Sequence, residues 1–213
     1  ESAYNQTFPA HEIIIVDEAH KAGSNTYLNF FREITNHPFI MGFTATPFRN
    51  DAINLQSIFG EMIYSKNLLE LINEGYLCDL QGYRIKSQIT IKNAKYTKGD
   101  FTSKSLFKIL NNDSRNTLIL DSFKKHCGNL KTLIFAINVE HCLIIERFFI
   151  VNGINARAIY GAMSLESRKN LIDDFKNGKI QVLINAQLLT EGFDAPCIEA
   201  LLIARPTMSK ILY

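Results

Sequence analysis

The sequence lacks the features that would place it in a membrane, in a secretory pathway or around a structural metal. No apolar run approaches the roughly 20 residues that a membrane-spanning helix needs, and no signal peptide is present. The four cysteines are scattered without C-x-x-C spacing, which predicts reduced thiols in a cytosolic-type compartment and no metal site. His11-Glu12 begins the zinc-protease pattern H-E-x-x-H, but Ile15 stands where the second histidine is required.

The bulk composition is that of an ordinary globular protein. The 213 residues, 46% hydrophobic and 21% charged, suffice for one large domain or two small ones. A net charge of +2 permits nucleic-acid binding without arguing for it. The chain begins with Glu1 and stops in mid-pattern at Tyr213, so we expect it to be an internal piece of a longer protein.

The rest of the chain is organised around residues 12–20, Glu-Ile-Ile-Ile-Val-Asp-Glu-Ala-His. The apolar run Ile13 to Val16 predicts a strand buried on both faces, as in a parallel sheet. Asp17 and Glu18 follow at its carboxyl end, where open α/β sheets bind their ligands. One carboxylate there can hold Mg²⁺ while its neighbour polarises an attacking water, which suits phosphoryl transfer.

A second buried strand is predicted from Phe39 to Phe43, followed by Thr44-Ala45-Thr46-Pro47. The two hydroxyls can hydrogen-bond across to the acidic segment, and His20 is their natural partner. Between these strands, Ser24 is placed to cap a helix whose core face would carry Tyr27, Phe31 and Ile34.

The middle of the chain carries weaker signals. We expect a short helix after Ile53, a strand near Met62 to Tyr64, and a helix from Asn67 to about Asn73 that Gly75 ends. Lysines 92, 95 and 98 then surround Tyr96 in a polar stretch. This stretch predicts a solvated linker or hairpin, or alternatively a phosphate-binding patch. We place the domain boundary here, between residues 1–92 and 93–213.

The second half alternates helices with strands, a pattern typical of βαβ units and a parallel sheet. Asn138 is predicted to cap a helix with Val139, Cys142, Leu143 and Phe149 on its inner side, which Gly153 ends. Ser164 caps the following helix. The expected helices are 101–110, 116–127, 139–152 and 165–177, and the expected strands are 132–136, 154–160, 180–185 and 199–204.

Asp17-Glu18-Ala19-His20 is a DEAH box, and the chain resembles a superfamily 2 helicase at four motifs in the right order. Thr44-Ala45-Thr46 resembles motif III, residues 132–136 with Asn138 resemble motif IV, and residues 182–196 resemble motif V. The signatures at 42–49, 188–196 and 204–207 are similar to the branch of restriction-enzyme translocases, a related bacterial DNA-repair helicase and the yeast mitochondrial branch-migration helicase. This resemblance implies an α/β fold of two RecA-like parallel-sheet domains, both incomplete.

The resemblance also implies roles for individual residues, with ATP and Mg²⁺ as cofactors. Asp17, which would bind Mg²⁺ directly or through water, Glu18 and His20 would be catalytic, and Thr44 and Thr46 would couple hydrolysis to nucleic acid. Within the second domain, four residues are assigned: Gly192 and Asp194 to the nucleotide side, and Asn138 and Thr190 to nucleic-acid binding. DNA is favoured over RNA as the partner, with no membrane partner, in the cytoplasm (at the nucleoid) or, in a eukaryote, in mitochondria or the nucleus.

The chain departs from the family pattern in three places. Ala186 stands where many members have a threonine two residues into the motif V turn, so a phosphate contact from that hydroxyl is not expected. No G-x-x-x-x-G-K-[ST] loop occurs, and the motif VI arginines are missing. We therefore expect these 213 residues alone to be inactive as an ATPase. An RNA helicase, or an ATP-inert nucleic-acid-binding module with the same fold, remains the alternative.

Overall fold

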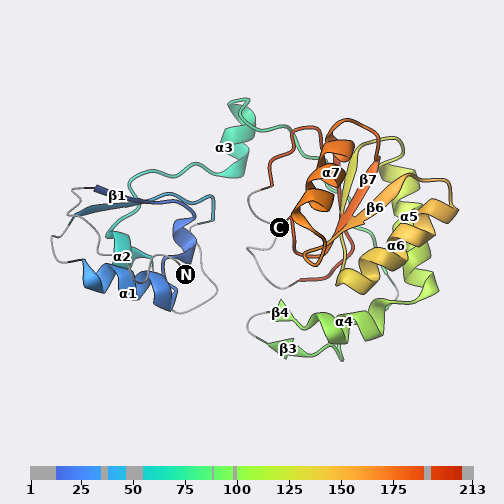
Figure 1. Ribbon diagram of the computed structural model, residues 1–213, viewed down its shortest axis with the longest axis horizontal. Coiled ribbons are helices and arrows are strands. Elements are labelled where there is room, and N and C mark those ends of the chain that lie inside the picture. The colour runs from blue at the N-terminus through green and yellow to red at the C-terminus, as the bar shows by residue number, and fades with distance from the viewer. Residues whose placement is uncertain are drawn as a thin grey trace. The chain divides into compact units, whose positions relative to one another are not determined.

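A computed structural model describes residues 13–34, 38–46, 55–87, 89–97, 100–189 and 193–207 (Figure 1). The chain divides into two compact units, residues 1–82 (unit 1) and 83–213 (unit 2). The boundary expected from the sequence, after residue 92, lies within unit 2. Within the described ranges, no helix is long and apolar enough to cross a membrane.

In its described residues, unit 1 contains a two-stranded parallel sheet and short helices. Its elements are β1 Ile13–Val16, the 3-10 helix η1 Ala19–Lys21, α1 Asn25–Glu33, β2 Phe39–Gly42, α2 Gln56–Phe59 and α3 Leu68–Asn73. In the sheet, Ile13 lies opposite Phe39 and Val16 opposite Gly42. The two strands predicted at 13–16 and 39–43 are therefore both present and run in parallel.

The expectation that β1 is buried on both faces is wrong for this chain. Ile14 and Val16 face a small core, but the side chains of Ile13 and Ile15 are 56% and 67% exposed. The reason is that the described helices supply apolar partners to one face only. That core contains Val16, Ala19 and Ala22, packed against Ile14, Tyr27, Phe31, Ile40, Ile58 and Phe59.

The ends of α1 differ in detail from the prediction. Tyr27 and Phe31 pack into the core as expected. Ser24 occupies the N-cap position but accepts no hydrogen bond through its side chain, and the helix ends at Glu33. Ile34 is extended (φ −78°, ψ 116°) and so does not belong to the helix face.

The helix at 68–73 follows its sequence signals closely. Asn67 Oδ1 accepts from the Glu70 N–H at 3.0 Å, and the Glu70 carboxylate accepts from the Asn67 N–H at 2.7 Å, forming a capping box. Gly75 (φ +79°) follows in the left-handed conformation that glycine adopts at low cost. The strand expected near Met62 to Tyr64 is absent, because residues 61–67 have no hydrogen-bonded neighbour strand among the described residues.

The described part of unit 2 contains a four-stranded parallel sheet in the order β6-β7-β5-β8 and a separate antiparallel strand pair, β3 and β4, called the hairpin below. In chain order, its elements are β3 Tyr96–Thr97, β4 Asp100–Phe101, α4 Ser103–Leu110, α5 Asp113–His126, β5 Thr132–Phe135, α6 Val139–Val151, β6 Ala156–Ile159, α7 Leu165–Lys176, β7 Val182–Asn185 and β8 Ala200–Ile203. The alternation predicted from the sequence, and with it the α/β fold class, is confirmed.

The sheet of unit 2 is covered on both faces (Figure 1). Ile134 and Ile184 belong to a cluster with the buried residues of α5 and α6, whereas Leu133 and Leu183 belong to a cluster with Phe175 of α7. Successive side chains of a strand point to opposite faces, so these four residues serve both layers. This is the arrangement expected of strands that are apolar throughout.

Three helix details in unit 2 correct the sequence analysis. Phe101 belongs to β4 and not to the helix that follows it. The helix expected from Asn116 begins earlier, because Asn112 Oδ1 caps it by accepting from the Arg115 N–H at 3.0 Å. Val139, expected inside, is 40% exposed because it is the first residue after the cap of α6.

A buried histidine ties α5 to α6. His141 is fully buried, its Nδ1 accepts a hydrogen bond from the Ile137 N–H at 3.3 Å, and its Nε2 lies 3.2 Å from Asn116 Oδ1. Because Nδ1 accepts, the ring proton is on Nε2 and is donated to the amide oxygen. Burial, with a smaller contribution from the positive charge of Arg115, lowers the pKa of His141 to about 4.

This histidine predicts an acid-sensitive unit 2. Below pH 6.5 the unfolded chain protonates His141 but the folded chain does not, so stability falls as the pH drops towards 4. A lowering of the pKa from 6.5 to about 4 corresponds to a loss of about 3 kcal/mol. The measurement is the difference in urea-unfolding free energy between wild type and His141→Gln from pH 7 to pH 4.

The difference in unfolding free energy between the wild type and His141→Gln should shrink on acidification, since glutamine does not titrate. The control is Thr117→Gln, at an exposed position of α5 that does not titrate, and it should show the same pH dependence of the unfolding free energy as the wild type. If the difference in unfolding free energy between the wild type and His141→Gln did not change with pH, the lowered pKa of His141 would be contradicted.

Candidate functional site

The candidate site of unit 1 lies where β1 and β2 end side by side. The Phe43 N–H donates to the Val16 carbonyl at 2.9 Å, and the Ala19 N–H donates to the Phe43 carbonyl at 2.9 Å. A side chain at Gly42 would meet Ala19 Cβ at 2.8 Å, so glycine permits this close approach. The two loops that follow the strands are thus joined by backbone hydrogen bonds beyond the sheet itself.

His20 is the centre of the polar contacts between these loops. Its Nδ1 lies 3.0 Å from Thr44 Oγ1, 3.4 Å from Thr46 Oγ1 and 3.2 Å from Glu18 Oε2. The Thr46 N–H donates to Thr44 Oγ1 at 3.1 Å, which leaves the Thr44 hydroxyl proton available. The contact predicted between His20 and the two threonines is confirmed, and the coupling role assigned to it stays a prediction.

These contacts suit both protonation states of Nδ1. A carboxylate only accepts, so a protonated Nδ1 donates to Glu18, whereas an unprotonated Nδ1 accepts from the Thr44 hydroxyl. His20 therefore connects the acidic loop with the threonine loop through a single atom. Its side chain is only 11% exposed, compared with 45% for Glu18.

The two carboxylates differ in their surroundings. Asp17 is exposed, and its Oδ1 accepts from the Glu18 N–H at 2.8 Å, so the second oxygen remains for a ligand. Glu18 has φ 49° and ψ 47°, a left-handed conformation that is uncommon for residues with a side chain. Such strain is often retained at functional sites.

The residues fit a magnesium ion that is shared with phosphate. Among the described residues, no three His, Cys, Asp or Glu side chains are grouped so that they could hold a metal by themselves. Mg²⁺ is typically bound by one or two carboxylates together with water and substrate phosphates. Asp17 would be the protein ligand in such a site, and Glu18 is its sequence neighbour.

The candidate residues of unit 2 follow the carboxyl ends of its strands. Asn138, after β5, is half-buried and its Oδ1 caps α6 by accepting from the His141 N–H at 2.8 Å. A nucleic-acid contact by Asn138 would therefore use its amide N–H groups. Asp194 is exposed, whereas Thr190 and Gly192 lie outside the described residues.

Sequence reasoning missed the buried polar groups that hold these loops. Asn185 at the end of β7 is buried, donates to the Ile134 carbonyl at 3.2 Å, and accepts from the Leu189 N–H at 3.2 Å. It therefore fixes the start of the loop that leads to Asp194. An asparagine that ends an apolar strand was the available signal, because a buried amide needs backbone partners.

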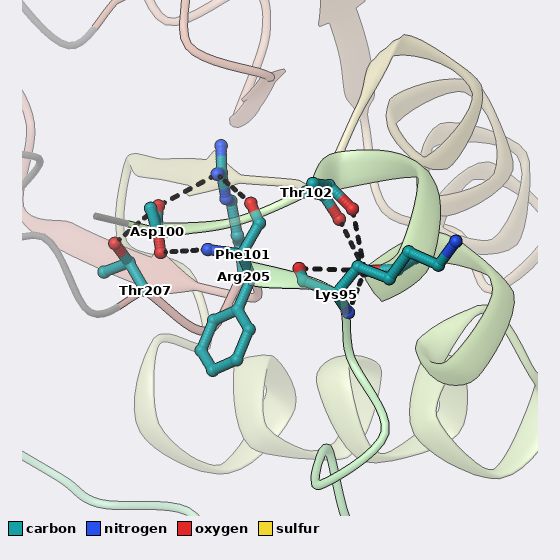
Figure 2. Close-up of polar contacts among 7 residues, drawn as sticks. Lys95, Asp100, Phe101, Thr102, Arg205 and Thr207 are labelled. Atoms are coloured by element: carbon teal, nitrogen blue, oxygen red, sulfur yellow. Dashed lines mark hydrogen bonds and ion pairs between the residues drawn. The ribbon is translucent and has the colours of Figure 1, made fainter. Parts of the chain in front are cut away.

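Arg205, after β8, was also missed as an individual residue. It is 4% exposed, and its Nη2 lies 3.0 Å from Asp100 Oδ2 (Figure 2). The Thr207 hydroxyl donates to the same oxygen at 2.9 Å. The pairing joins residues more than a hundred positions apart, which neither segment reveals on its own.

Comparison with known proteins agrees with this architecture. Residues 3–116 match the family described as SWI2/SNF2 ATPase, and residues 114–213 match the helicase conserved C-terminal domain. The first match covers more than half of the chain, so the chain belongs to the SWI2/SNF2 ATPase family within superfamily 2.

Individual relatives share this architecture. The chain is 34% identical over 208 residues to IRC3 of Saccharomyces cerevisiae, which is named as an ATP-dependent helicase. The aligned region covers 94% of this chain but only 30% of IRC3. A fragment named as the HsdR subunit of a type I restriction enzyme from Vibrio vulnificus matches with a TM-score of 0.67 at 24% identity, over 92% of this chain and 37% of the other. The L327V variant of Dbp5 from S. cerevisiae, bound to RNA and ADP BeF3, matches with a TM-score of 0.52 at 15% identity, over 91% of this chain and 44% of the other. These structural likenesses show the fold, and the chain spans only about a third of IRC3.

The left-handed conformation of Glu18 predicts an unusual response to glycine. Glu18→Gly and Glu18→Ala both remove the carboxylate, but only glycine adopts φ 49° without strain. We expect Glu18→Gly to be more stable than Glu18→Ala by about 1 kcal/mol, measured as urea-unfolding free energy. At Thr26, an exposed position within α1, the order should reverse because glycine weakens helices. Equal stability of the two Glu18 variants would show that this position is not strained.

Proposed function

We propose that this chain is part of an ATP-dependent helicase or translocase that acts on DNA, hydrolysing ATP to move along or separate strands. The observation that carries the proposal is the contact of His20 with both Glu18 and Thr44. A side chain that contacts both the acidic loop and the threonine loop can transmit a change at the hydrolysis site to the residues that would couple it to nucleic acid. Membership of the SWI2/SNF2 ATPase family supports the ATPase part.

The proposed chemistry assigns one task to each side chain. Mg²⁺, when bound, neutralises charge on the phosphates. Asp17 would hold it through the carboxylate oxygen that does not accept the Glu18 N–H. Glu18 would take a proton from the attacking water, and its 45% exposure leaves it accessible to that water. A change at Glu18 during hydrolysis would alter its contact with His20, and His20 would transmit that change to Thr44 through their hydrogen bond.

DNA is favoured over RNA as the substrate because the signatures at 42–49, 188–196 and 204–207 resemble those of restriction-enzyme translocases and a DNA-repair helicase. The likeness to a type I restriction-enzyme subunit points the same way, whereas the likeness to Dbp5 bound to RNA keeps RNA as the rival substrate. Nucleic-acid-stimulated ATPase activity of the full-length protein, measured with DNA and RNA of one sequence, distinguishes the two. Stimulation by RNA alone would overturn the DNA assignment.

The Glu18→Gln substitution in the full-length protein tests the enzymatic part of the proposal. Glutamine keeps the size of the side chain but removes the base, so ATP should still bind while turnover falls by about 10²-fold or more. Binding is measured with a fluorescent nucleotide and turnover by phosphate release. Glu33→Gln, an exposed acid at the end of α1, is the charge-matched control and should retain turnover. Normal turnover in Glu18→Gln would remove Glu18 from the chemistry.

The double substitution Thr44→Ala/Thr46→Ala tests the coupling role. Neither hydroxyl is needed for Mg²⁺ or water, so we expect ATPase activity to persist while unwinding or translocation becomes poor. A lost hydrogen bond costs about 1 kcal/mol, which is large against a coupling free energy of about 1–3 kcal/mol. The measurement is base pairs opened, or base pairs travelled, per ATP hydrolysed. Thr44→Ser/Thr46→Ser retains the hydroxyls and should restore the ratio. An unchanged ratio in the alanine variant would show that these hydroxyls do not form the link.

A further inference from the structure

Positive charge is concentrated in one segment of unit 2. Residues 86–110 contain six lysines, no arginine and one acidic residue, Asp100, which gives this segment a formal charge of +5 in a chain whose net charge is +2. The remainder of the chain is therefore net negative. An uneven distribution of this kind indicates a surface that attracts anions.

The one acidic residue of the segment does not offset the lysines. Asp100 Oδ2 receives hydrogen bonds from Arg205 Nη2 at 3.0 Å and from the Thr207 hydroxyl at 2.9 Å, and Oδ1 accepts from the Phe101 N–H at 2.8 Å (Figure 2). Because Arg205 is buried, the charge of Asp100 is compensated from the protein interior. The lysines on the outside are left without that counter-charge.

The backbone that carries the lysines is held firmly. The Lys95 N–H donates to Ser105 Oγ at 2.9 Å, and the Lys95 carbonyl accepts from the Thr102 N–H at 2.8 Å (Figure 2). The hairpin is thus attached to the start of α4 at one end and to Arg205 at the other. Lys92 and Lys95 are exposed on this support.

A shared core places these lysines beside the loop after β5. Ile89, Ile91 and Ala94 pack with Phe101 and α4 around a buried cluster of Leu106, Leu110 and Ile137. Ile137 directly precedes Asn138, the residue assigned to nucleic acid. The segment 89–95, the hairpin and α4 therefore pack around one core with the residue that precedes Asn138. The side chains of Lys92 and Lys95, in the segment before β3, and of Lys104 and Lys108, on α4, are exposed to solvent.

The position of Lys104 on α4 is unfavourable for the helix alone, whereas Lys108 lies in the last turn, where the helix dipole favours a cation. The two lysines are four residues apart, a spacing at which like charges repel on a helix. Lys104 also lies in the first turn, which contains no acidic residue, although the helix dipole disfavours cations there. An anion bound at the start of α4 would offset the repulsion between the two lysines, and the helix dipole and Lys104 would then attract the same charge.

We propose that Lys92, Lys95, Lys104 and Lys108, with Tyr96 among them, form a lysine surface that binds the phosphates of a nucleic-acid strand beside Asn138. The inference rests on the proposed function in taking nucleic acid as the partner. Four lysines, two in the segment before β3 and two on α4, exceed what one nucleotide requires, and they suit successive phosphates. Tyr96 is 58% exposed and is held edge-on against Phe101 with ring centroids 5.9 Å apart, so its ring is available for base stacking.

The test measures binding of the 213-residue chain, without nucleotide, to a fluorescein-labelled oligothymidine of about 20 residues, a length that exceeds the site of one binding fold. The variant replaces Lys92, Lys95, Lys104 and Lys108 with glutamine. The matched control makes the same change in net charge at the exposed lysines 124, 125, 169 and 176 of α5 and α7. Circular dichroism establishes that both variants remain folded.

The lysine-surface variant should bind at least about tenfold more weakly at ~0.1 M salt, with a salt dependence shallower by about 0.7 for each lysine that contacts a phosphate. The control should bind within about threefold of the wild type, because screening weakens distant charges. Tyr96→Ala should weaken binding and Tyr96→Phe should not, since phenylalanine retains the ring.

Equal weakening in both lysine variants would reduce the effect to net charge and overturn the inference, as would an absence of measurable binding by the wild-type chain. These outcomes are separate from the Glu18→Gln test, which concerns ATP turnover in the full-length protein. A protein that passes one test and fails the other identifies which of the two proposals is wrong.

Discussion

Parallel strand pairing is the constraint on which the candidate site depends. Parallel strands end at the same edge of a sheet, so the residues that follow them meet there however far apart they are in sequence. In unit 1 the pairing of β1 with β2 extends through the Ala19 N–H to the Phe43 carbonyl, beyond the last strand residues. This extension places His20 within hydrogen-bond distance of Thr44.

The two units differ in how completely their parallel sheets are covered and in how the loops after the strands are held. In unit 2 both faces of the sheet are covered, and the loops that follow the strands are held by buried polar groups. His141, Asn185 and Arg205 each place side-chain hydrogen bonds or charge where an apolar residue would only fill space. Such groups are costly unless paired, and so they favour one arrangement of the loops over its alternatives.

In unit 1 the described helices cover one face of a two-stranded sheet, and Ile13 and Ile15 remain exposed on the other. Exposed β-branched residues on a parallel strand are unusual, because parallel sheets are normally buried on both faces. The polar site of unit 1 nevertheless forms, since its hydrogen bonds involve residues that directly follow β1 and β2. Local pairing of the strand ends is sufficient for the geometry of Glu18, His20 and Thr44.

Short-range chemistry allowed the sequence alone to determine much of this protein. The capping box at Asn67, the cap at Asn138 and the apolar runs of β5 and β7 depend on neighbours a few residues away, so their patterns predict them directly. The contact of His20 with Thr44 was also predictable, because two strand ends in a parallel sheet must meet. Motif resemblance supplied the family.

Only the tertiary structure decided the features that depend on distant partners. The length of α1, the exposed face of β1 and the missing strand near Met62 follow from which apolar surfaces find a partner. The burial of His141, and the pairing of Arg205 with Asp100 across more than a hundred residues, carry no local signal. A side chain's hydrogen-bonding groups are visible in a sequence, but burial and partner are properties of the packed chain.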